Sequence, residues 1–223
     1  MNELVVGTIK GFVKGAVSQV PIAGPIVTAV YDEVVSASLL KRRAEWEKTI
    51  EQRLEALEDE RIVEKLIGNE SFVSCLIQAT REALSTHQHE KIERFANAVV
   101  NSISSSLEDD KKQIFLRWIE RYSELHILIL LFSNDPAFWL TKAGISLIEP
   151  PKHQTLKQML EVVYPNRLID EDLIKLVIND LYSDGLIRTR GLSSSEIFDR
   201  GFTTSIAKEF INFVSINSEE KTR

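Results

Sequence analysis

The sequence predicts a mostly all-α protein, built as an antiparallel helical bundle with an amino-terminal helical hairpin and a small carboxy-terminal α+β module. Three observations lead to this prediction. Residues 64–132 repeat apolar positions at spacings of three and four, with short polar turns between the repeats. Residues 1–40 are rich in glycine and apolar residues, and residues 135–223 combine short helices with one alternating stretch. We therefore expect three parts, with bounds 1–40, 41–134 and 135–223.

Composition limits the class of protein. The chain has 223 residues, of which 43% are hydrophobic and 27% are charged, as in a globular protein with a real core. Its net charge of −6 argues against a general nucleic-acid binder, because phosphate binding needs a basic face. Cys75 is the only cysteine, which favours a reducing cytosolic setting. We expect no signal peptide, since Glu3 stands where a basic cluster would be needed.

The first predicted helix covers about residues 3–20 and is amphipathic. Its broad apolar face includes Phe12, and Lys10 and Lys14 lie one turn apart on the opposite side. Three glycines recur at every fourth position, and we call them the glycine stripe: Gly7, Gly11 and Gly15. Each costs about 1 kcal/mol against alanine in a helix, so we expect close packing against another helix or a membrane to offset that cost. Such a glycine zipper, with its lysines, can lie on a membrane surface or dock into a groove.

A tight corner is expected to join this helix to the next. Pro21 ends the first helix, Gly24 lies in the corner, and Pro25 suits the first turn of a second helix that runs to about Leu57. The uncharged run between Gly15 and Tyr31 is about the minimum length for a bilayer span, but both prolines interrupt it. We therefore expect no fixed single crossing, and leave open a hairpin that inserts only in an activated or oligomeric state.

The second helix changes character at the basic triplet 41–43. Before the triplet the sequence is apolar, and after it charged residues dominate. We favour a solvated helix face for the triplet. The alternative is an anchor at an anionic membrane surface.

The middle of the chain, residues 64–132, predicts the helical bundle most firmly. Asn69 is placed to cap a helix that begins at Glu70, and Asp109 and Asp110 suit the first turn of a later helix. Asn134-Asp-Pro136 marks the expected domain boundary.

The tail has the element order of a winged-helix-like module. Two short helices are expected at about residues 153–163 and 170–183, and Gly185 ends the second. Residues 186–190 and 197–203 are then expected to pair as a hairpin, before a final helix. Arg188, Arg190 and Arg200 are candidate wing contacts with DNA, but the helix before them is acidic. We therefore favour a module for protein contact or oligomer assembly.

The tail and middle also carry a family resemblance. The runs Leu181-Tyr-Ser-Asp-Gly185-Leu-Ile187 and Phe202-Thr-Thr-Ser-Ile-Ala-Lys-Glu-Phe210-Ile follow the closing pattern of small bacterial winged-helix modules, although Ala207 replaces its usual glycine. With Glu-Arg-Ile-Val-Glu-Lys at 60–65 and Phe-Ala-Asn-Ala-Val-Val at 95–100, the layout resembles the Abi-alpha (abortive infection) family over about residues 55–214. This resemblance implies a role in bacterial defence against phage, without an active site to transfer. In outline only, the amino-terminal hairpin resembles the membrane-permeabilising four-helix domains of cell-death executioners.

No set of residues in the sequence predicts catalysis, cofactor binding or a metal site. His87 and His89 are two residues apart, so on a helix they point in different directions, whereas a metal pair needs a spacing of three or four. Cys75 lies on an apolar helix face, where an inert buried thiol is the simpler interpretation. No phosphate-binding loop or serine elbow is present. We expect no enzyme, no cofactor and no small-molecule substrate.

Two functional classes remain. The first is an anti-phage effector, or effector component, of the bacterial cytoplasm that meets inner-membrane lipid through its amino-terminal hairpin, as a homo-oligomer or with a partner defence protein. The second is a soluble helical adaptor or regulator whose tail contacts proteins. A DNA-binding regulator ranks third.

Overall fold

The computed structural model describes residues 3–21, 29–57, 59, 61–104, 106–145, 156–165, 170–188 and 201–215. Within these residues the fold is all-α and helices pack as a bundle, which confirms the coarser part of the predicted fold class. Eleven helices lie in the described ranges: α1 (Glu3–Ser18), α2 (Ala29–Glu55), α3 (Ile62–Leu66), α4 (Glu70–Ser85), α5 (His89–Ser104), α6 (Asp109–Arg121), α7 (Glu124–Asn134), α8 (Pro136–Lys142), α9 (Leu156–Val163), α10 (Glu171–Ser183) and α12 (Ser205–Val214).

The chain divides into two compact units. The first consists of residues 1–121 together with residues 213–223, and the second consists of residues 122–212. The hairpin expected as a separate part therefore belongs to the first unit, and the boundary expected near Asn134 falls inside the second. There Asp135 caps α8 by accepting a hydrogen bond of 2.9 Å from the Phe138 N–H, and Pro136 takes the first helical position.

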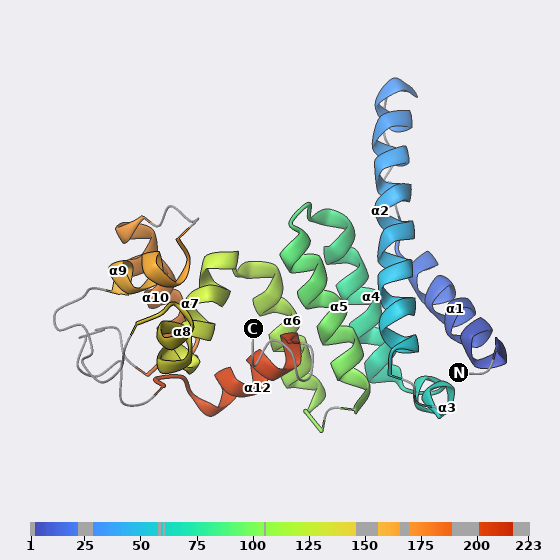
Figure 1. Cartoon of the computed structure of the whole chain (residues 1–223). Helices are drawn as coiled ribbons and strands as arrows, with labels where there is room; N and C mark the ends of the chain where they lie inside the picture. Colours follow the sequence, from blue (N-terminus) through green and yellow to red (C-terminus); the bar gives the residue numbers. More distant parts are fainter. Residues whose placement is uncertain are drawn as a thin grey trace. The chain divides into compact units, whose positions relative to one another are not determined.

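In the first unit, α4 and α5 pack side by side, and α2 and α6 each contact both of them. The carboxy-terminal half of α2 runs along this pair, while α1 lies against α2 and α4 (Figure 1). Local signals set the helix ends as predicted: Asn69 Oδ1 accepts a hydrogen bond of 2.9 Å from Phe72 N, and Asp109 and Asp110 occupy the first turn of α6. The core contains the large side chains Phe72, Phe95 and Phe115, all fully buried.

Residues 213–215, where α12 ends, are held in the first unit by two asparagines of α5. Asn97 donates a hydrogen bond of 2.8 Å to the main-chain oxygen of Val214. Asn101 donates hydrogen bonds of 2.9 Å to the oxygens of both Phe213 and Ser215. The Phe213 ring also lies 5.6 Å from that of Phe115. These contacts satisfy carbonyl groups at the end of α12 that have no partner within the helix.

In the second unit, α7 packs against α10 and α8, and α8 packs against α9. Asp170 caps α10 by accepting a hydrogen bond of 2.8 Å from Leu173 N. Gly185 follows α10 with a positive φ of 73°, so the predicted glycine termination is confirmed.

The predicted β hairpin of the winged-helix-like module is not found in the described residues. No strand is present among residues 186–188 and 201–204; one isolated antiparallel bridge joins Ile187 to Thr203. Among these residues, pairing is limited to that bridge, where Arg188 N donates to Phe202 O and Thr204 N donates to Leu186 O. The neighbouring backbone N–H groups have partners elsewhere. The N–H groups of Leu186 and Ile187 both donate to the oxygen of Leu181 in α10, and Phe202 N donates to Ser133 O. The remainder of the expected hairpin, residues 189–200, lies outside the described residues.

Candidate membrane-binding helix

The apolar side of α1 packs against the first unit, and its central stripe is buried there. Ile9, Val13 and Val17 form one stripe at a spacing of four, and each is completely buried. The Phe12 ring stacks on Phe72 of α4, with ring centroids 5.9 Å apart. Burying an aliphatic side chain of this size contributes about 1.5–3 kcal/mol, so this stripe is what holds α1 on the bundle.

The glycine stripe points the other way. Gly7, Gly11 and Gly15 are exposed, and a Cβ atom added to any of them would meet nothing within 4 Å. The close helix contact that we expected from them is therefore absent from the described structure. Helix geometry explains this, because each glycine is two residues from a buried position, which is a rotation of about 200° around the axis. Their helix cost of about 1 kcal/mol each is not offset by packing here.

Lys10 and Lys14 are also exposed, on the same outward side as the glycines. Within the described residues, neither lysine forms a salt bridge. We define the α1 outer face as Gly7, Lys10, Gly11, Lys14 and Gly15. This face carries two basic side chains, whereas the opposite side is apolar and packs against the bundle. Burial raises the pKa of Glu47 in α2, and Lys14 is one of the charges that act to lower it.

The end of α1 is held by an arginine from α2. Arg43 donates a hydrogen bond to the main-chain oxygen of Val20, two residues beyond the end of α1. The neighbouring Arg42 donates one of 3.3 Å to the oxygen of Leu84 in α4. Both arginines therefore bind carbonyl groups at helix ends, where a positive charge is favoured. These hydrogen bonds of Arg42 and Arg43 support neither the solvated helix face nor the membrane anchor that we considered for residues 41–43.

A cavity of about 290 Å³ adjoins this end of α1. Pro21, the predicted end of the hairpin's first helix, is exposed and lines the cavity with Leu39. Helices α1 and α2 pack together as a hairpin requires, but Gly24 and Pro25 lie outside the described residues.

Only one of the three candidate wing residues lies in the described ranges. Arg188 is exposed, and its main-chain N–H donates a hydrogen bond of 2.9 Å to Phe202 O. Arg190 and Arg200 lie outside the described residues.

A histidine cluster in the second unit was missed by sequence reasoning. His126 Nδ1 lies 3.2 Å from the Ser123 N–H and 2.8 Å from Ser123 Oγ, and Nε2 lies 3.3 Å from Asp180 Oδ2. Because Nδ1 accepts from the N–H, the ring proton lies on Nε2 and is donated to Asp180. This is a capping box in which histidine replaces the usual glutamate, so Ser-x-x-His was the available signal. It fixes the start of α7 and ties it to α10.

A second missed cluster surrounds Cys75 in the first unit. Lys112 is buried, and its Nζ lies 2.9 Å from Ser71 Oγ and 3.2 Å from Asp109 Oδ1. Cys75 is fully buried, as expected, and burial raises the pKa of its thiol, against a smaller opposing effect of Lys112. A thiol held protonated is a poor nucleophile, which favours a structural role for this cluster.

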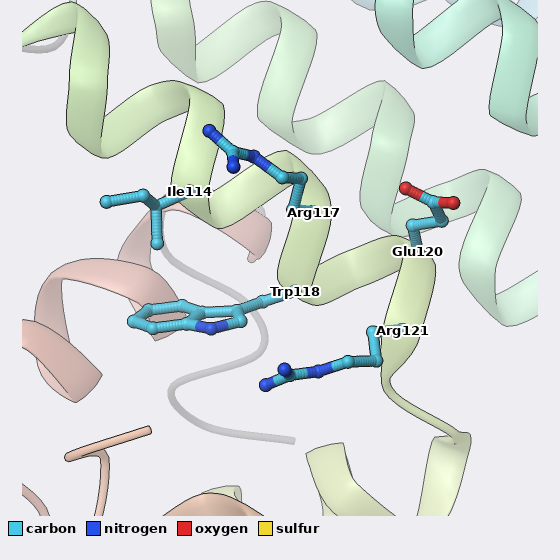
Figure 2. A pocket seen from close by; sticks show the side chains of 5 residues that line it. All are labelled: Ile114, Arg117, Trp118, Glu120 and Arg121. Carbon is cyan, nitrogen blue, oxygen red and sulfur yellow. The ribbon is translucent and has the colours of Figure 1, made fainter. Parts of the chain in front are cut away.

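One further hollow lies on α6, with a volume of about 490 Å³. Ile114, Trp118 and Arg121 extend to one side of the helix, whereas Glu120 points the other way (Figure 2). Arg117 completes the lining.

Among the described residues, no group of three or more histidine, cysteine, aspartate or glutamate side chains is placed to hold a metal ion. In the same residues, no helix combines the length and the apolar character that crossing a bilayer would demand. Comparisons of the chain with protein-family models, with curated proteins and with solved structures found no match. The Abi-alpha resemblance therefore stays a prediction from the sequence.

Proposed function

We propose that this chain is a bacterial anti-phage effector, or effector component, of the abortive-infection type, which acts when α1 leaves the bundle and binds the inner membrane. The observation that carries the proposal is the two-sided character of α1. Its apolar stripe is buried on the bundle, and its α1 outer face presents two lysines to solvent. A helix of this kind, once released, can lie in an anionic membrane surface with its apolar side inserted.

The glycine stripe makes α1 less firmly held than its buried side chains alone would make it. The three glycines lower the helix stability of α1 by about 3 kcal/mol relative to alanine, without the close packing that would offset it. The chain therefore keeps α1 less stable than its own burial would allow. This lowered stability is useful if α1 must detach, because the elements of a protein that move are those of low stability.

The release of α1 can be tested with a substitution in α2 that weakens the attachment of α1 and leaves the α1 sequence unchanged. Arg43→Ala removes the charged hydrogen bond at Val20 O, worth about 1.5 kcal/mol or more, and should raise leakage of vesicles containing phosphatidylglycerol several-fold. Arg42→Ala is the matched control, because this substitution removes a similar hydrogen bond to α4 and does not touch α1. Equal leakage for the two variants would contradict the release step.

Membrane contact is tested on α1 itself. Lys10→Glu with Lys14→Glu should abolish co-sedimentation with anionic vesicles, because the two charges that meet the lipid are reversed. Pure phosphatidylcholine vesicles are the control and should show little binding with either protein. Gly11→Leu should remove leakage while the bundle stays folded, since the added side chain meets no neighbour on the bundle. Unchanged leakage with Gly11→Leu would count against the α1 mechanism.

The second candidate is a soluble helical adaptor or regulator, in which α1 stays docked as part of the core. The observation in its favour is the complete burial of the α1 apolar stripe. Expression of the full chain separates the two: a wholly soluble fraction with no growth defect supports the adaptor. A DNA-binding regulator remains the third choice, and a salt-dependent gel shift would support it.

A further inference from the structure

Helix α10 exposes two large apolar side chains that the second unit does not need for its core. Leu173 is 44% exposed and Leu176 is 56% exposed. The other side of the same helix is buried through Ile174, Val177 and Leu181. Leu173 and Leu176 are three residues apart, so they are neighbours on one helix face.

Carboxylates frame these two leucines. The Asp172 side chain is 92% exposed, and Asp180, one turn beyond Leu176, is half exposed. The one basic residue of the helix, Lys175, is held between Glu171 and Asp172 at 3.4 and 3.2 Å. We define the α10 outer face as Asp172, Leu173, Leu176 and Asp180. Its charge disfavours phospholipid and nucleic acid and fits a basic helix.

The chain itself holds a helix face that complements this one. The α1 outer face carries Lys10 and Lys14, and it lacks side chains at its three glycines. Protruding leucines of one helix can settle into the shallow surface left by glycines on another, while lysines approach carboxylates. We infer that the α10 outer face of one copy binds the α1 outer face of a second copy. The inference goes beyond the proposed function and does not depend on it.

The two faces are different surfaces, so the contact is heterologous and each copy has both halves of it. Such an interface links copies head to tail and produces rings or open chains. Two helix faces bury less area than a standard stable interface, so the assembly should be weak and should dissociate in high salt.

The decisive experiment mixes two singly disabled full-length proteins and measures mass by light scattering after size exclusion. One carries Lys10→Glu and Lys14→Glu; the other carries Leu173→Asp and Leu176→Asp. Wild type should form concentration-dependent oligomers, and each variant alone should be monomeric over the same range. Their mixture should contain heterodimers and nothing larger, because only one intact contact remains. Lys41→Glu and Ile67→Asp are the controls, since both residues are exposed but lie on neither face.

Three outcomes would overturn the inference. The first is a wild type that stays monomeric at every concentration measured. The second is oligomers that persist in both variants, and the third is a mixture that stays monomeric while wild type assembles. Circular dichroism of each variant checks that its helices remain folded. Vesicle leakage is measured separately, so the light-scattering result can still be interpreted if the membrane proposal fails.

Discussion

Ser71 on α4 donates a hydrogen bond of 2.5 Å to Asp109, the first residue of α6. The same carboxylate oxygen lies 3.2 Å from Lys112 Nζ, which also bonds to Ser71 Oγ. The pKa of Asp109 is lowered chiefly by the bond from Ser71, and next by the bond from Lys112. One carboxylate thus joins two helices of the first unit and stabilises the start of α6.

Asp109→Asn should destabilise the first unit at neutral pH, and the loss of stability relative to wild type should be much smaller in acid. The folded pKa of Asp109 lies below its ordinary value of 3.8. Its stabilising effect is therefore complete above that value and disappears as the pH falls through the folded pKa. Urea unfolding at pH 7 and near pH 3 should show the gap between variant and wild type closing in acid. Asp110→Asn, on the same first turn, is the control. A gap that is the same at both pH values would mean that the Asp109 charge is not involved.

Gly11→Ala should raise stability. Gly11 lies in the middle of α1, and its added Cβ meets nothing. Alanine is better than glycine in a helix interior by about 0.8–1 kcal/mol, and no clash reduces that gain. Thermal unfolding should show the increase. A loss of stability would reveal a close neighbour of the glycine stripe in the resting protein.

Gly201→Ala should have the opposite effect. An added Cβ would lie 2.2 Å from the main-chain oxygen of Asn134, and that backbone cannot move away without breaking the adjacent bond from Phe202 N to Ser133 O. Overpacking of this kind costs about 1–3 kcal/mol. Urea unfolding followed by circular dichroism measures it. A neutral result would show that residues 133–134 give way easily.

Cys75 should resist alkylation in the folded protein. Its side chain has no exposure and burial raises its pKa, so a reagent reaches the thiolate only after the first unit opens. We expect labelling by iodoacetamide at pH 8 to be at least about 1,000-fold slower in buffer than in denaturing urea. Fast labelling in buffer would instead point to local opening around α4.

Sequence periodicity was sufficient for the helices of the bundle and for several of their ends. Asn69, Asp170 and Gly185 each act where local rules place them, because caps depend on a few neighbouring residues. The side of α1 that faces the bundle was also implicit in the spacing of Ile9 and Val13, two residues away from the glycines. The glycine cost predicts close packing against another helix or a membrane, and it does not indicate which side of α1 faces the bundle.

The remaining features depend on residues distant in sequence. The hairpin after Gly185 was predicted from alternation and from the turn residues 191–195. Neither contains information on the other partners, Leu181 O and Ser133 O. The contact of His126 with Asp180 and the bond from Lys112 to Ser71 join different helices, so no local pattern shows them. The candidate membrane helix was predicted from the sequence. Its burial on the bundle and the hydrogen bond from Arg43 to Val20 O are seen only in the structure.

The hydrogen bonds from Asn97 and Asn101 to residues 213–215 have a consequence for biosynthesis. Residues 213–215, which complete the first unit, leave the ribosome more than a hundred positions after the asparagines that bind them. The first unit therefore stays incomplete while the second unit is translated, and it can close only after residues 213–215 have been made. A premature stop shortly before Phe213 should accordingly weaken the unit that was made first.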